Sequence, residues 1–208
     1  MNTWLVIPVK SVRDGKTRLA SALDLVQRRA FMDRLLVHTL NQAAAFPGLE
    51  RTLVVSACGE TRARAAALGA QVLNESGCGL NAAVKQAQTN IRQRGATQML
   101  IVPCDLPFLC SEDLHYLSRR ALSNVIVIAP DRGSHGTNGM CFDAALDFDF
   151  EFGPDSYTHH VDNARRLRRD LAAAIRPGLA FDVDTPDDLA ELYKREGYRQ
   201  VTESVSAR

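Results

Sequence analysis

The sequence lacks several features that would assign the protein to a specialised class. Its 208 residues carry a formal net charge of only +1, so no overall field favours nucleic acid or an acidic membrane surface. No apolar run approaches the length of a membrane-spanning helix, and the start of the chain lacks the basic-then-apolar order of a signal peptide. We therefore expect a cytoplasmic protein that binds neither nucleic acid nor membranes, and in which any anion site is local.

Cysteine pairs and histidine clusters are also missing. The five cysteines are odd in number and none lies in a C-x-x-C pair, which argues against a disulfide framework and a structural zinc site. The histidines show no metal-ligand spacing, and the neighbouring His159 and His160 are typical of a polar helix surface. We interpret the cysteines as reduced, mostly buried thiols and assign no histidine to a metal.

What the sequence does contain is an alternation of short apolar runs with longer stretches of helical period. With 46% hydrophobic residues, residues 1–208 can bury one substantial core, so we expect a single domain with a frayed tail from about Thr202. The alternation predicts an α/β fold of Rossmann-like, three-layer α/β/α type, with a mainly parallel central sheet. The predicted strands are Trp4–Val9, Leu53–Ser56, Gln71–Leu73, Met99–Pro103 and Val125–Ala129. The predicted helices are Val26–Phe46, Glu60–Leu68, Leu80–Arg94, Glu112–Leu122 and one that begins at Thr185.

Two glycine motifs resemble nucleotide-binding signatures but fit them poorly. Gly15-Lys16-Thr17 resembles the end of a P-loop, yet Lys10 stands where that motif needs a glycine. Residues 77–82 match the G-x-G-x-x-A dinucleotide pattern, but a lone match is weak and lies in a later strand–helix unit. As a loop that enters a helix, this segment could still approach a nucleotide closely at Gly79, with Asn81 contacting the base or ribose.

Charged side chains follow the predicted strands at what should be one edge of the sheet. The segment after the first strand carries the cations Lys10, Arg13, Lys16 and Arg18. Asp105 follows a buried-strand pattern and should emerge at the same edge, where open α/β sheets bind ligands. Each signal alone has a simpler explanation, because a charge run is often solvated and such an aspartate often caps a turn.

Two further aspartates lie close together near the end of the chain. In residues 179–184 the alternation directs Asp182 and Asp184 to one side of an extended segment, just before the helix that Thr185 begins. Two carboxylates on one face repel unless a cation lies between them, and Mg²⁺ prefers carboxylate and phosphate oxygens. The alternative is that Asp184 caps the helix and Asp182 is solvated.

Two loops, residues 129–139 and 150–157, place small hydroxyl residues beside glycines. Backbone N–H groups and hydroxyls of this kind suit a phosphate or carboxylate, especially where Ser156 could begin a helix, although ordinary turn chemistry is an equal alternative. Together with the carboxylates, these loops suit nucleotidyl transfer. A phosphate acceptor is already ionised, so no general base is needed. Magnesium held by Asp105, Asp182 and Asp184 would bridge the substrates, while Lys16 and Arg18 would offset charge on departing pyrophosphate.

Eight motifs, in this order, make the chain resemble the guanylyltransferases of coenzyme F420 biosynthesis, which act on 2-phospho-L-lactate, phosphoenolpyruvate or 3-phospho-D-glycerate. The motifs are VIPVK at 6–10, KTRL at 16–19, GLNA at 79–82, PCDLP at 103–107, APD at 129–131, GTN at 136–138, FGPDS at 152–156 and DVDTP at 182–186.

The resemblance covers nearly the whole chain and implies a nucleotidyltransferase fold. It also implies GTP as co-substrate, a phosphorylated three-carbon acid as acceptor and Mg²⁺ on Asp105, Asp182 and Asp184. Acceptor contacts are implied at Thr137, Gly153 and Ser156.

The sequence leaves other functions open. A nucleotidyltransferase of the same fold could act on a sugar phosphate or a molybdenum cofactor, because a fold does not fix the acceptor. A nucleotide-binding regulator without turnover would need the aspartates to be capping groups only. A homodimer is the default expectation for the assembly.

Overall fold

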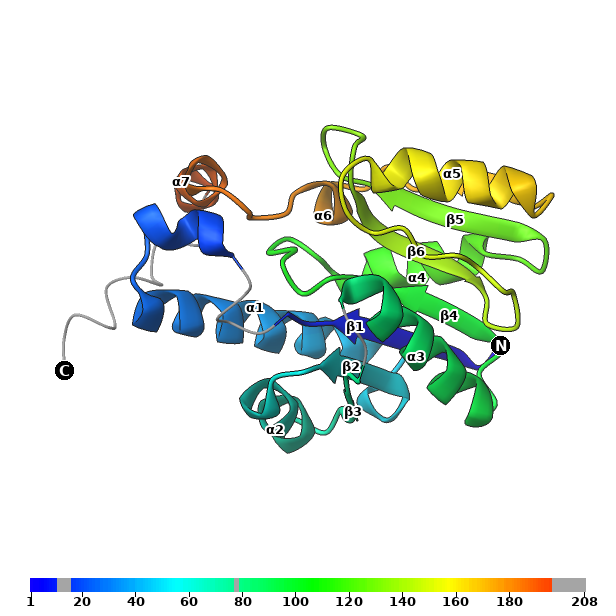
Figure 1. Cartoon of the computed structure of the whole chain (residues 1–208), viewed down its shortest axis with the longest axis horizontal. Helices are drawn as coiled ribbons and strands as arrows, with labels where there is room; N and C mark the ends of the chain where they lie inside the picture. Colours follow the sequence, from blue (N-terminus) through cyan, green and yellow to red (C-terminus); the bar gives the residue numbers. More distant parts are fainter. Residues whose placement is uncertain (11–15, 77–78, 196–208) are drawn as a thin grey trace.

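The computed structural model describes residues 1–10, 16–76 and 79–195, and it contains a seven-stranded sheet between layers of helices (Figure 1). The strands are β1 (Thr3–Pro8), β2 (Thr52–Ser56), β3 (Gln71–Asn74), β4 (Gln98–Ile101), β5 (Val125–Pro130), β6 (Thr137–Asp143) and β7 (Asp170–Ala173). Their order in the sheet is β3-β2-β1-β4-β6-β5-β7. Within the described chain only β6 runs antiparallel to its neighbours, so the sheet is mainly parallel, as predicted.

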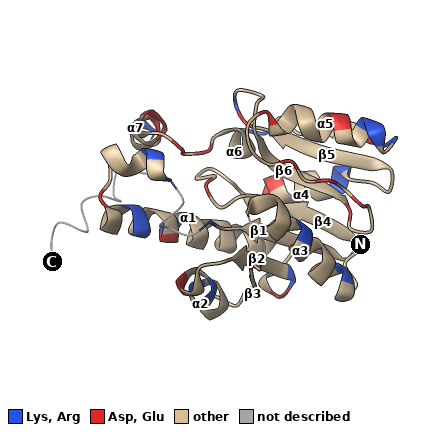
Figure 2. Ribbon diagram, in the orientation of Figure 1, with Lys and Arg blue, Asp and Glu red and all other residues tan. Residues whose placement is uncertain are grey.

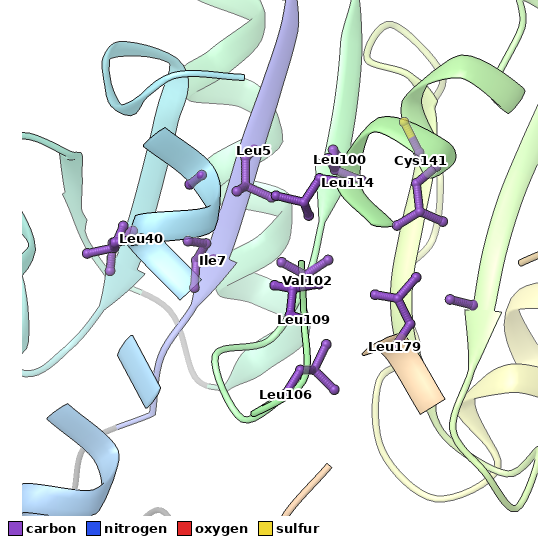
Figure 3. Packing of buried hydrophobic residues seen from close by; sticks show 14 of the residues in the cluster. Leu5, Ile7, Leu40, Leu100, Val102, Leu106, Leu109, Leu114, Cys141 and Leu179 are labelled. Carbon is purple, nitrogen blue, oxygen red and sulfur yellow. The ribbon is translucent and has the colours of Figure 1, made fainter. Parts of the chain in front are cut away.

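Helices cover both faces of this sheet. They are α1 (Leu25–Ala45), α2 (Gly59–Ala67), α3 (Leu80–Gln93), α4 (Ser111–Arg120), α5 (Ser156–Arg166), α6 (Pro177–Ala180) and α7 (Pro186–Lys194), with 3-10 helices η1 (Thr17–Ser21) and η2 (Leu49–Arg51). Alternate residues of β1 point to opposite faces. Leu5 and Ile7 pack with α1, α2, α4 and α6 (Figure 3), whereas Trp4 and Val6 pack with α3 and α5.

A third, smaller core lies beyond the carboxyl edge of the sheet. Phe181 and Val183 pack there against η1, the first half of α1 and α7, and Figure 1 shows η1 and α7 side by side. Helix α7 begins at the predicted N-cap, where the Thr185 hydroxyl accepts a hydrogen bond from the Asp188 backbone N–H at 3.2 Å. This small core fixes the segment that carries Asp182 and Asp184.

The predicted α/β fold is confirmed, but several local predictions are wrong. β6 and β7 were not predicted, and the expected loop at 129–139 instead contains the end of β5 and the start of β6. The extended segment expected at 179–184 begins inside α6. Of the four described cysteines, all are free thiols, but only Cys141 is fully buried.

None of the described helices is both long and apolar enough to span a bilayer. The tail expected to fray from Thr202 lies outside the described residues, as do residues 11–15 and 77–78.

Candidate active site

The three predicted carboxylates converge at the carboxyl edge of the sheet. Asp105 follows β4, and its backbone carbonyl accepts a hydrogen bond from the Val183 N–H at 3.3 Å, which brings the aspartates on either side of Val183 next to it. Asp105, Asp182 and Asp184 line one cleft of about 180 Å³. The cleft lies at the carboxyl ends of the neighbouring strands β1 and β4, where the strand order reverses: the chain continues from β1 towards the β3 edge of the sheet and from β4 towards the β7 edge. Such a reversal point is the usual ligand position in open α/β sheets.

Lys16 enters this acidic cluster from the start of η1. Its ammonium lies 2.7 Å from Asp105 Oδ2 and also donates to Asp184 Oδ1, and its side chain is only 9% exposed. Burial alone would lower the pKa of Lys16, but the charges and hydrogen bonds of Asp105 and Asp184 outweigh burial and raise it. Lys16 is therefore charged and neutralises part of the cluster.

The charges and hydrogen-bond acceptors of the carboxylates are only partly balanced by Lys16, so the cluster could bind a further cation. Burial, and then the charges of Asp105 and Asp184, raise the pKa of Asp182, although a hydrogen bond from Asn138 opposes the rise. Asp105 Oδ1 is buried and has no hydrogen-bond partner among the described residues. No three acidic, histidine or cysteine side chains in the described ranges are already arranged around a metal position. The donor set nevertheless fits a hard cation such as Mg²⁺, since it consists of crowded carboxylate oxygens, one of them unpaired.

Two ion pairs, each with a buried carboxylate and a more exposed arginine, hold the segment that carries Asp182 and Asp184. Arg176 donates to the buried Asp113 carboxylate of α4 at 2.7 Å, which anchors α6. Asp188 accepts a hydrogen bond from the Asp184 backbone N–H at 3.1 Å and is paired with Arg132 of the β5–β6 loop. The acidic stretch between α6 and α7 is visible in Figure 2. The position of both aspartates thus depends on contacts from two other elements.

The same cleft is also lined by the predicted acceptor-binding residues. Thr137 begins β6, Gly153 lies in the loop before α5, and Ser156 is the first residue of α5; all three line the cleft. The Thr137 hydroxyl is 3.0 Å from His160 Nδ1. His160 is completely buried, so the prediction that the histidine pair lies on a polar helix surface is wrong for His160, while His159 is exposed.

The remaining predicted residues do not line the cleft. The Asn81 side chain accepts from the Phe152 backbone N–H at 2.7 Å and donates to its carbonyl at 3.3 Å, so it ties α3 to the loop before α5. Gly79 precedes α3 with a φ of 99°, a conformation that favours glycine. Lys10 and Arg18 are exposed.

Sequence reasoning missed two polar residues of the site. Asn138 donates to Asp182 at 3.3 Å and to the Leu179 carbonyl at 2.9 Å, which links β6 to the acidic segment. His160 lies four residues after Ser156 and therefore on the same helix face, a spacing that could have indicated a shared environment. The cleft also has an apolar part, formed by Pro8, Leu80, Ile101, Pro103 and Phe152.

The fold and this site define a nucleotidyltransferase-type α/β protein, in which an acidic cluster and hydroxyl groups line one cleft at the carboxyl edge of the sheet. Solved structures share the fold. A chain from Desulfovibrio desulfuricans G20 matches with a TM-score of 0.74 at 19% identity, covering 96% of this chain and 90% of the other. A nucleotidyl transferase from Methanothermobacter matches with a TM-score of 0.66 at 15% identity, covering 92% and 96%.

The chain belongs to the family described as "Guanylyl transferase CofC like", whose model matches residues 3–202. It is 36% identical over 196 residues to the phosphoenolpyruvate guanylyltransferase of Rubrobacter xylanophilus, covering 92% of this chain and 94% of the relative. It is 30% identical over 195 residues to the 2-phospho-L-lactate guanylyltransferase of Methanothermobacter thermautotrophicus, covering 92% and 84%. The resemblance drawn from the eight sequence motifs is thereby confirmed.

Proposed function

We propose that the protein transfers GMP from GTP to a phosphorylated three-carbon acid, releasing pyrophosphate, as a step of coenzyme F420 biosynthesis. The candidate acceptors are phosphoenolpyruvate, 3-phospho-D-glycerate and 2-phospho-L-lactate. The observation that carries the proposal is that the acidic cluster of Asp105, Asp182 and Asp184 shares one cleft with Thr137 and Ser156, in a chain from this family.

In this reaction the protein needs mainly to align the two substrates and to offset their negative charge. An oxygen of the acceptor phosphate attacks the α-phosphorus of GTP, the bond from that phosphorus to the bridging oxygen breaks, and pyrophosphate leaves with the electron pair. The attacking oxygen is already ionised, so no proton must be removed.

The residues present divide these tasks. Asp105, Asp182 and Asp184 would hold Mg²⁺, which supplies positive charge that offsets the phosphate oxygens of both substrates. Lys16, already charged and next to Asp105, can compensate negative charge that develops on the leaving group. Thr137, Ser156 and the backbone around Gly153 suit binding of the anionic acceptor, because they offer hydroxyl and N–H donors.

The test is pyrophosphate release with GTP, Mg²⁺ and each of the three acids, run beside ATP and CTP as alternative donors. We expect release with GTP and at least one acid, and the comparison of acids identifies the acceptor. Release only with a sugar phosphate would assign a different nucleotidyltransferase activity. Nucleotide binding with no release for any acceptor would overturn the proposal in favour of a regulator.

A further inference from the structure

His160 is a buried histidine of α5 that connects two walls of the candidate active site. Its ring is fully shielded from solvent, Nδ1 lies 3.0 Å from Thr137 Oγ1, and Nε2 accepts a hydrogen bond from the Glu151 backbone N–H at 3.1 Å. Phe152 packs edge-on against the ring at 4.8 Å between centroids. The imidazole therefore joins the start of β6 to the loop that carries Gly153.

The two hydrogen bonds fix the tautomer of His160. A backbone N–H can only donate, so Nε2 must carry no hydrogen, and a neutral imidazole then carries its hydrogen on Nδ1. Nδ1–H consequently donates to the Thr137 hydroxyl. Burial, together with the neighbouring His159, lowers the pKa of His160 to about 4, which keeps the ring neutral near pH 7.

This tautomer restricts the Thr137 hydroxyl. One of its lone pairs accepts from His160, so its own hydrogen must point away from the imidazole. In the part of the chain that the structure describes, Thr137 Oγ1 has no other hydrogen-bond partner, and Thr137 lines the cleft with Gly153 and Ser156. The hydroxyl can therefore offer its hydrogen to a ligand in the cleft.

We propose that His160 is a positioning residue for the acceptor, which holds the Thr137 hydroxyl as a hydrogen-bond donor to an anionic oxygen of the phospho-acid. The hydrogen bond from the Glu151 backbone N–H holds His160 in the tautomer that makes this possible. This inference rests on the proposed function. His160 itself contacts no substrate and exchanges no proton; it acts by selecting one orientation of the Thr137 hydroxyl.

Two substitutions separate the two hydrogen bonds of His160. His160→Gln can place its side-chain oxygen near the Nε2 position and still accept from Glu151, but it offers Thr137 no donor there. His160→Asn can place its amide nitrogen near the Nδ1 position and still donate to Thr137, while Glu151 loses its acceptor. We expect His160→Gln to raise KM for the phospho-acid roughly tenfold, equal to about 1.4 kcal/mol, with KM for GTP unchanged. His160→Asn should recover most of the acid affinity.

A matched control and a double variant complete the kinetic test. The exposed neighbour His159→Gln should leave both KM values unchanged. If His160 acts through Thr137, the double variant His160→Gln/Thr137→Val should be no worse than Thr137→Val alone. An unchanged KM for the acid in His160→Gln, or equal losses with Gln and Asn, would overturn the positioning role while the proposed function stands.

A second measurement does not depend on turnover or on the folding of a variant. Nitrogen-15 NMR of the imidazole in the wild-type protein should show a neutral ring with hydrogen on Nδ1 at pH 7. A charged ring, or hydrogen on Nε2, overturns the inference. If instead the wild-type protein releases no pyrophosphate with any of the three acids, the proposed function fails, and with it the acceptor role of His160.

Discussion

Asp105 has two carboxylate oxygens in contrasting environments. Oδ2 lies 2.7 Å from Lys16 Nζ, whereas Oδ1 is buried without a hydrogen-bond partner among the described residues. We expect Asp105→Asn to keep the fold, because one charge is removed without a change of shape. Turnover should fall by at least ~100-fold, since loss of a direct ligand costs no less than loss of an outer-shell partner. Circular dichroism and pyrophosphate release measure the two effects, and near-normal turnover would remove Asp105 from the metal site.

Lys16 and a metal ion would serve the same carboxylates, so removing the lysine should change the response to Mg²⁺. Without metal, Lys16→Gln leaves the acidic cluster uncompensated. We expect the free energy of unfolding to fall by about 1–2 kcal/mol. This is less than the usual cost of breaking a buried ion pair, because Asp184 is 47% exposed and screened by solvent. Added Mg²⁺ should then raise Tm more in the variant than in the wild type, as no ammonium competes with it.

The control for Lys16 is Lys85→Gln, which removes a partner of the 87% exposed Asp147. Such a surface pair contributes little, so Tm should barely move with or without Mg²⁺. Differential scanning fluorimetry across a Mg²⁺ titration provides the comparison. Equal Mg²⁺-induced shifts in wild type and Lys16→Gln would show that Lys16 does not compete for the site.

At the scale of elements, α6 depends on the absence of a side chain at Gly178. A Cβ atom there would collide with the Asp113 carboxylate and lie 2.6 Å from the Phe108 carbonyl. We expect Gly178→Ala to cost about 1–3 kcal/mol of unfolding free energy, because backbone cannot shift cheaply in a packed site. It should also lower turnover, since α6 leads into Asp182. Urea unfolding and pyrophosphate release measure both effects.

Gly59→Ala is the matched control for Gly178→Ala. Gly59 begins α2, and a Cβ atom there has its nearest contact at 3.8 Å from Arg62. Alanine has the higher helix propensity, so we expect a neutral or slightly stabilising effect. Equal free energies of unfolding for the two variants would contradict the prediction, because they would show that α6 shifts enough to accommodate the added methyl group.

The elements that sequence reasoning missed have identifiable causes. β6 begins Thr137-Asn138-Gly139, which are turn-forming residues, yet its first six residues are buried because the strand is central and covered on both faces. Asn138 is tolerated there since Leu179 and Asp182 accept its hydrogen bonds. β7 is a short edge strand whose residues Asp170–Ala173 show no apolar alternation.

The position of Asp105 at the carboxyl edge was predictable, because residues that follow strands of a parallel sheet emerge at one edge. Asp182 and Asp184 follow α6 and not a strand, so their position beside Asp105 depends on tertiary contacts such as the Val183–Asp105 hydrogen bond. The role of His160 was not predictable either, since burial of one member of a histidine pair depends on how α5 packs on the sheet. The roles of Lys10, Gly79 and Asn81 in binding GTP stay predictions, as do the role of Arg18 in offsetting charge on pyrophosphate, the homodimer and the cytoplasmic location.

At the scale of the whole molecule, the buried His160 couples global stability to pH. Its pKa is about 4 in the folded protein against 6.5 as the ordinary value. Between these values the unfolded chain binds a proton that the folded protein does not, so stability falls as pH falls. The contribution is fully present above about pH 6.5 and is lost progressively towards pH 4. From pH 7.5 to pH 5 we expect a loss of about 2 kcal/mol from this residue.

Urea unfolding of the wild type and His160→Gln at both pH values isolates this contribution. Other titrating groups contribute equally to both proteins, so the difference between the two losses belongs to His160. His160→Gln should be less stable than the wild type at pH 7.5, because it gives up the hydrogen bond to Thr137, but that deficit should shrink by about 2 kcal/mol at pH 5. The exposed His159→Gln should follow the wild type at both values. A deficit that stays constant between pH 7.5 and pH 5 would mean that His160 can charge in the folded protein, which its contacts with Thr137 and Glu151 oppose.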